Sequence, residues 1–233
     1  MKKGRGWLLA YPVTVLAVLA TVLCGSRIVT VFAENQPLPR RRCIIIDAGH
    51  GGVDGGAVSC KGLPESGYNL EIALCLEDLL HFLGFETRMI RREDISVYTK
   101  GETIAQKKIS DLKERVRMVN ETPGALLLSI HQNYFSDSRY SGAQVFYPDT
   151  EGSKALATAL QTALRATLDP ANHRQARKSS GVYLMEQIRC TAVLLECGFL
   201  SNPEEEAKLR SKEYRQKLCG AIAVTIGSFL SNT

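Results

Sequence analysis

The stretch that decides the fold is CIIIDAGHGG, residues 43–52. Its run Cys43–Ile46 is apolar and rich in β-branched residues, which predicts a buried strand. Asp47 and a glycine-rich turn follow at once, so polar groups stand at the carboxyl end of that strand. α/β proteins build their binding and catalytic sites at this position. The glycines let the backbone turn sharply around His50, so that a substrate or an ion can approach its ring.

The rest of the chain alternates short apolar runs with longer helical patterns. Strands are predicted at Thr87–Ile90, Ala125–Ile130, Ala143–Tyr147 and Ala192–Leu195. Helices are predicted at Asn69–Leu83, Ile109–Glu121, Ser153–Leu168 and Tyr214–Leu230, and another helix starts at Asn202-Pro203. Strands alternating with helices favour a mainly parallel sheet. We therefore expect an α/β fold, a three-layer sandwich in which a twisted, mainly parallel sheet is flanked by helices.

The composition is that of a globular protein. The chain has 233 residues, 45% of them hydrophobic and 23% charged, which argues against a disordered, collagen-like or polytopic membrane protein. The net charge is +5, but residues 1–33 contain four of the 29 basic residues and no acidic one. The remainder holds 25 basic and 24 acidic residues. A near-neutral remainder argues against nucleic acid as a partner.

The first 33 residues form a leader. No charge interrupts the chain between Arg5 and Arg27, and basic residues precede this apolar stretch. That pattern is typical of a signal peptide cleaved after Ala33, or of an uncleaved N-terminal membrane anchor. Residues 34–42 contain two prolines and three arginines and are interpreted as a linker. Either way, we expect residues 43–233 to work outside the cytoplasm, secreted to the cell exterior or anchored at the membrane.

Polar residues end three of the apolar runs. His50 follows the first strand, His131 ends the apolar run that leads into SIHQN at residues 129–133, and Glu196 ends the run that precedes CGF. Two histidines and a carboxylate are the ligands of an open hydrolytic zinc site. A further carboxylate can then accept a proton from water. Glu65, Glu71 and Glu196 are the candidates for these two carboxylate roles, and their spacing alone does not separate them.

Several spaced motifs carry a resemblance to a known family. In order they are DAGHGGVDGGA at 47–57, LPES at 63–66, SIHQN at 129–133, SGAQVFY at 141–147, SGVYLM at 180–185 and VLLECGFLSNPEE at 193–205. Together they resemble the zinc-dependent N-acetylmuramoyl-L-alanine amidases over about residues 43–230. Two segments, ERVRMVN at 114–120 and the insert around Thr99–Leu112, resemble the branch of this family that acts on spore-cortex peptidoglycan in sporulation and germination.

The resemblance implies a role for each candidate. His50, Glu65 and His131 become the zinc ligands, and Glu196 becomes the catalytic carboxylate. The implied reaction is hydrolysis of the amide between N-acetylmuramic acid and the L-alanine of the peptidoglycan stem peptide. In spore cortex this exposes a muramic carboxyl group that another enzyme can close into a lactam. The family usually follows its ligand glutamate with Lys-Asp or Lys-Asn, and Ser66-Gly67 stand here instead. We expect this departure to weaken the hold on Glu65.

Two other functions stay open at this point. The same metal and base would serve a zinc peptidase that cuts inside the stem peptide, and a chain that has lost turnover would be a peptidoglycan-binding protein. An accessory protein for zinc loading is a further possibility that the residues do not decide. Arg115 and Arg117 lie two positions apart and point to different sides of their helix. One of them can reach a substrate carboxylate, with a surface salt bridge as the alternative.

Overall fold

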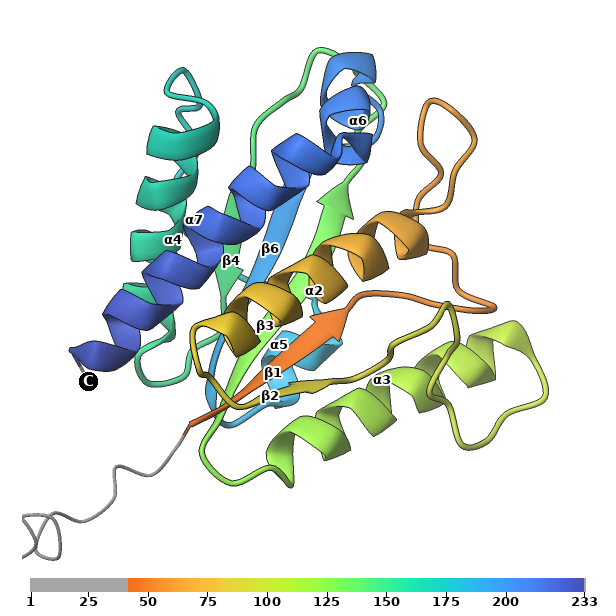
Figure 1. Cartoon of the computed structure of the whole chain (residues 1–233). Coiled ribbons are helices and arrows are strands. Elements are labelled where there is room, and N and C mark those ends of the chain that lie inside the picture. The colour runs from red at the N-terminus through yellow and green to blue at the C-terminus, as the bar shows by residue number, and fades with distance from the viewer. Residues whose placement is uncertain (1–41, 233) are drawn as a thin grey trace, which may run out of the picture. The chain divides into compact units, whose positions relative to one another are not determined.

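The structure is a computed structural model that describes residues 42–232; the predicted leader and all of the predicted linker except Arg42 lie outside the described residues. Six strands form one sheet in the order β2-β1-β3-β6-β4-β5 (Figure 1). Their bounds are Cys43–Ala48 (β1), Thr87–Met89 (β2), Ala125–Asn133 (β3), Gln144–Tyr147 (β4), Arg177–Lys178 (β5) and Thr191–Phe199 (β6). β2, β1, β3 and β6 are parallel, and β4 runs antiparallel to β6. The mainly parallel sheet is therefore confirmed.

Helices cover both faces of this sheet. Their bounds are Glu65–Phe82 (α2), Ile104–Asn120 (α3), Ser153–Leu168 (α4), Tyr183–Gln187 (α5), Pro203–Arg210 (α6) and Lys212–Ser231 (α7). α2, α4 and α7 pack on one face, and α3 and α5 pack together on the other (Figure 1). The fold is thus the predicted three-layer sandwich. No helix within residues 42–232 is long and apolar enough to cross a membrane.

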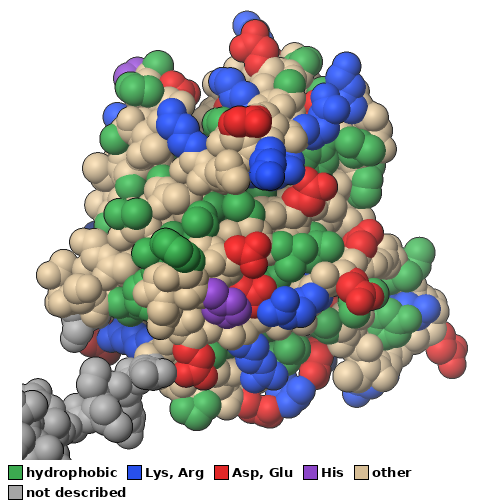
Figure 2. All heavy atoms as spheres, in the orientation of Figure 1, with side chains coloured by type: hydrophobic (Ala, Val, Ile, Leu, Met, Phe, Trp, Pro, Cys, Tyr) green, Lys and Arg blue, Asp and Glu red, His purple; other side chains and the backbone are tan. Residues whose placement is uncertain are grey.

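The run Cys43–Ile46 is apolar at every position because both faces of β1 are buried. Ile44 and Ile46 belong to the core under α2, α4 and α7, whereas Ile45 belongs to the smaller core under α3 and α5. All three side chains are fully buried. A strand covered on both faces needs apolar residues without alternation. On the outer surface, by contrast, Figure 2 shows basic and acidic side chains interspersed over the face of the molecule turned to the viewer.

The structure extends several of the predicted elements. α2 begins at Glu65, four residues before the predicted start, with Pro64 as its N-cap residue. α3 begins at Ile104 rather than at residue 109, because Thr103 and Gln106 form a capping box there. β3 and β6 continue past their apolar runs to Asn133 and Phe199. β3 therefore carries His131, and β6 carries Glu196, inside the sheet rather than in the loops beyond it.

Candidate metal centre and active site

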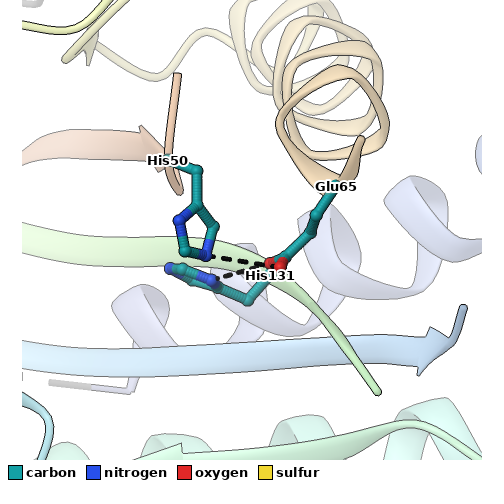
Figure 3. Close-up of side chains that lie close together, drawn as sticks. All are labelled: His50, Glu65 and His131. Atoms are coloured by element: carbon teal, nitrogen blue, oxygen red, sulfur yellow. Dashed lines mark hydrogen bonds and ion pairs between the residues drawn. The ribbon is translucent and has the colours of Figure 1, made fainter. Parts of the chain in front are cut away.

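The carboxyl ends of the parallel strands meet at one edge of the sheet, and three of the five candidate residues come together there as one cluster. His50 follows β1, His131 lies near the end of β3, and Glu65 is the first residue of α2. One ligand atom from each of the three residues lies within 4.8 Å of the other two. Figure 3 shows both imidazole rings turned toward the carboxylate of Glu65. The chain segments separating these residues are long, so only the fold creates the cluster.

The turn after β1 aims the ring of His50. His50 has a φ of +60° and is the one non-glycine residue with positive φ among residues 42–232. Its Nδ1 lies 3.0 Å from Asp54 Oδ2, which leaves Nε2 facing Glu65 Oε2 at 3.3 Å. A carboxylate on the far nitrogen is the partner that metal-binding histidines commonly have, because it fixes the tautomer and the ring orientation. Asp54 was not among the residues predicted from sequence.

Glycine at position 49 makes room for the second histidine. A Cβ built on Gly49 would lie 2.2 Å from ring atoms of His131, well inside any allowed contact. The ring of His131 therefore packs directly on the backbone of the turn that precedes His50. Its Nδ1 lies 3.0 Å from Glu65 Oε1. The glycine at position 49 is thus needed for close approach between two segments of the site.

The carboxylate of Glu65 is held on all sides. Oε1 accepts hydrogen bonds from the backbone N–H of Gln132 and from Asn69 Nδ2, both at 3.1 Å, and Oε2 accepts one from the backbone N–H of Ala57 at 3.0 Å. Asn69 lies one helical turn after Glu65 and also donates to the carbonyl of Gly49. Asn69 and two backbone groups thus hold Glu65 despite the Ser66-Gly67 departure, after which we expected a weaker hold.

The electrostatics of the cluster favour a cation. Burial alone would raise the pKa of Glu65, but hydrogen bonds from His131 and His50 outweigh it and hold that pKa well below its ordinary value. Burial opposes charge on His50 as well, yet Glu65 and Asp54 raise its pKa to about 9. The two carboxylates thus stabilise a positive charge on His50 and beside Glu65. A divalent metal ion placed among the same three donors would satisfy that demand, and His-Glu-His is a donor set that zinc accepts.

Glu196 faces the same site from the neighbouring strand. It lies opposite His131 in the register of β3 and β6, and both residues line a cavity of about 330 Å³ together with His50. Burial raises the pKa of Glu196 to about 7. Its Oε2 is buried, and among residues 42–232 no group hydrogen bonds to it. A buried carboxylate oxygen without a hydrogen-bond partner beside a candidate metal site is available to accept a proton.

The structure distinguishes the three carboxylates whose roles could not be assigned from their spacing in the sequence. Glu71 lies on the outer surface of α2, where its side chain is 61% exposed and pairs with Arg215 at 3.0 Å. Glu65 joins the histidines, and Glu196 lines the cavity beside them. The two arginines of α3 also differ, as predicted. Arg115 is buried, whereas Arg117 forms exposed ion pairs with Glu114 and Glu121.

Comparison with known proteins gives the family. The model of the N-acetylmuramoyl-L-alanine amidase family matches residues 44–228, about four-fifths of the chain. The germination-specific N-acetylmuramoyl-L-alanine amidase of Bacillus subtilis is 36% identical over 183 residues, which are 78% of this chain and 76% of that protein. The amidase LytC of the same organism is 31% identical over 182 residues, 77% of this chain but only 34% of that longer protein.

Solved structures agree with the sequence comparison. The structure of the CwlD amidase of Clostridioides difficile in complex with the GerS lipoprotein has a TM-score of 0.79 and 36% identity, covering 82% of this chain and all of that one. An N-acetylmuramoyl-L-alanine amidase of Clostridium difficile 630 has a TM-score of 0.72 and 26% identity over the same share of this chain and 98% of its own. The chain belongs to the N-acetylmuramoyl-L-alanine amidase family.

Proposed function

We propose that this amidase holds one zinc ion between His50, Glu65 and His131 and hydrolyses the amide that joins the lactyl group of N-acetylmuramic acid to L-alanine. One observation carries the proposal. A complete His-Glu-His donor set lies beside an unpartnered carboxylate oxygen of Glu196, because His50, His131 and Glu196 line the same cavity. The match to the amidase family favours this bond over bonds inside the stem peptide.

The chemistry divides between the metal and the chain. Zinc in such a site acts as a Lewis acid that polarises a carbonyl group and makes a nearby water more acidic. Glu196 accepts the proton of the attacking water and then donates it to the nitrogen of L-alanine as the carbon–nitrogen bond breaks. Asp54 and Asn69 keep His50 and Glu65 in place while this happens. The products are a muramic carboxyl group and a stem peptide with a free amino end.

We further infer where the enzyme works. The substrate is peptidoglycan, so residues 43–233 act as a catalytic domain outside the cytoplasm, with residues 1–33 as signal peptide or anchor and residues 34–42 as linker. The germination-specific relative supports a role in spore cortex, where removal of the stem peptide prepares muramic acid for lactam formation. The complex of the Clostridioides difficile relative with a lipoprotein supports an accessory protein for this chain too.

Three variants of the full-length chain test the roles. Glu196→Gln is expected to retain one zinc per chain and lose at least ~100-fold in kcat, because the general base is gone while the ligands remain. His131→Ala is expected to lose both zinc and activity. Glu71→Gln is the matched control, since that carboxylate is exposed on the same helix as Glu65 and is expected to keep both. Metal content by mass spectrometry and turnover of muramyl peptide are measured on each protein.

Each role has an outcome that overturns it. A Glu196→Gln protein with ordinary turnover would remove Glu196 from the mechanism. Undiminished zinc content after His131→Ala would remove that residue from the metal site. A wild-type chain that folds, binds no zinc and releases no stem peptide would leave the alternative of a non-catalytic peptidoglycan-binding protein.

A further inference from the structure

Two buried arginines lie behind the metal centre, and the reaction described above uses neither. Arg91 follows β2 and Arg115 lies in α3, and each is only 2% exposed. Within residues 42–232, their hydrogen bonds go to no side chain of a candidate zinc ligand. Both guanidinium groups instead point at the backbone of the turn between β1 and His50. Fully buried arginines are rare unless they are paired, so these two require an explanation.

The contacts of Arg115 tie this turn to α3. Its Nη1 donates to the carboxylate of Asp47 and to the carbonyl of Ala48, the latter at 3.0 Å. Its Nη2 donates to the carbonyl of His50 at 2.7 Å. Its Nε donates to Asp111 at 2.6 Å, one helical turn away on α3. Two carboxylates therefore neutralise and orient Arg115, while its remaining bonds go to backbone at and before the metal ligand.

Arg91 holds the same turn from another side. Its Nε donates to the carbonyl of Ala48, and its Nη2 donates to the carbonyls of Gly49 and Ser66, all at 2.9 Å. Three consecutive carbonyls, those of residues 48, 49 and 50, thus accept hydrogen bonds from two guanidinium groups. Ser66 is the neighbour of the ligand Glu65, so Arg91 also links the turn to the start of α2. Flat groups with several donors in fixed directions suit this task.

Burying the two positively charged side chains of Arg91 and Arg115 near each other is by itself unfavourable. Burial and then repulsion from Arg115 lower the pKa of Arg91, so the two like charges oppose each other inside the fold. The turn that they hold contains His50 in left-handed backbone geometry, which residues other than glycine rarely adopt. Such features persist only where the surroundings over-determine them, and they cluster at functional sites. The arginines provide that constraint.

Contact with substrate explains these arginines less well. A guanidinium group has five N–H donors. The hydrogen bonds described above use four of the five N–H donors of Arg115. Arg91 also uses four donors: one on Nε, two on Nη2, and one on Nη1, which donates to the carbonyl of Glu93. The side chain of Arg115 is 3% exposed and that of Arg91 is fully covered. Little of either group remains for a carboxylate of the stem peptide.

We propose that Arg91 and Arg115 are positioning residues that fix the turn from Ala48 to His50, so that Nε2 of His50 faces Glu65 and His131 before the metal binds. The inference rests on the proposed zinc site. It predicts that weakening this hold lowers the affinity for zinc more than it affects the binding of substrate. Residues that orient metal ligands through hydrogen bonds commonly have this effect.

The test compares full-length variants that keep the positive charge. Arg115→Lys retains the charge but cannot reach two carboxylates and two carbonyls at once. Arg91→Lys is the equivalent change on the other side. Asp111→Asn leaves Arg115 in place and removes the charge that orients its Nε, which keeps the test available if a lysine variant fails to fold. Arg117→Lys is the matched control, because Arg117 lies on the same helix in exposed ion pairs.

Zinc affinity is measured by competition with a chromogenic chelator, and kcat and KM are measured at saturating zinc. Arg115→Lys and Arg91→Lys are expected to weaken zinc binding by ~10–100-fold, and Asp111→Asn by about 10-fold or less, with KM close to the wild-type value. Arg117→Lys is expected to change neither quantity. Folding is checked by the thermal unfolding of each zinc-free protein.

The possible results distinguish a failure of the positioning role from a failure of the proposed zinc site. Folded lysine variants whose zinc affinity equals that of the wild type would overturn the positioning role. A raised KM with unchanged zinc affinity would assign Arg115 to substrate contact instead, and so would also overturn it. Absence of zinc binding by the wild-type chain itself would overturn the proposed metal site, and that result is visible before any variant is compared.

Discussion

Replacement of Glu196 by glutamine should stabilise the zinc-free protein while it greatly lowers turnover. Burial raises the pKa of Glu196 from 4.5 to about 7, which means that the fold disfavours the charged carboxylate. Each pH unit of such a difference corresponds to about 1.4 kcal/mol, so the upper limit is about 3 kcal/mol. Glu196 keeps partial access to the cavity, and the expected gain for Glu196→Gln at pH 8 is therefore about 1–2 kcal/mol.

The sign follows from proton binding. Between pH 4.5 and about 7, the unfolded chain releases the proton of Glu196 whereas the folded chain keeps it. The folded state then binds more protons, so its free energy of unfolding falls as the pH rises through that window. Glutamine cannot lose a proton there. The gain from Glu196→Gln is consequently largest above pH 7 and vanishes near pH 4.5.

The assay is urea unfolding of both proteins with a chelator present, at pH 5 and at pH 8. A gain of about 1–2 kcal/mol at pH 8 that shrinks by more than half at pH 5 is expected. The chelator is needed because a cation among the neighbouring ligands would stabilise the carboxylate and hide the difference. A destabilised variant at pH 8, or equal differences at the two pH values, would refute the reasoning about burial.

Three further predictions follow from the site. Gly49→Ala forces the ring of His131 aside and is expected to weaken zinc binding by at least ~10-fold in a chelator competition. Gly67→Ala is the contrasting change in α2: its added Cβ meets no atom within 4 Å, and it is expected to add about 0.5–1 kcal/mol to the free energy of unfolding. Asn69→Ala removes a donor from the ligand carboxylate and is expected to weaken zinc binding by ~10–100-fold; unchanged affinity would contradict the role given to it. The wild-type profile of kcat/KM against pH is expected to fall on the acid side at or below about pH 7, because Glu196 must be ionised to accept a proton, and Glu196→Gln should leave no such limb in its residual rate.

The fold could be predicted largely from its apolar runs. An uninterrupted run such as Cys43–Ile46 indicates a strand covered on both faces, and the structure shows Ile45 on one side of the sheet and its neighbours on the other. The polar ends of these runs also located His50 and His131. Element starts were less accurate where they depend on caps. Pro64 and Thr103 set the starts of α2 and α3 earlier than the apolar pattern does.

The assignment of the carboxylates needed more than spacing. Glu65 and Glu71 lie six residues apart in the sequence, and both are on α2. Only the packing of that helix on the sheet decides that Glu65 turns inward and Glu71 outward. The motif resemblance reached the same assignment, but the residue pattern by itself left it open.

The residues that support the site were the least predictable. The helical period placed Arg115 and Arg117 on different sides of α3 without saying which of them is buried. Arg115 is buried because Asp47, 68 positions away, and Asp111 receive it. Charged residues are ordinarily placed at the surface by sequence reasoning, and burial of one depends on partners that only the tertiary structure provides.

The most direct test of the central claim is product analysis of peptidoglycan digested by the purified full-length chain, with zinc and with a chelator, alongside Glu196→Gln. We expect zinc-dependent release of intact stem peptides that begin with a free L-alanine amino group, and no release by the chelated protein or the variant. Cuts inside the stem that leave L-alanine attached to muramic acid, or release that persists in the chelator, would contradict the assignment of this site as a zinc amidase centre.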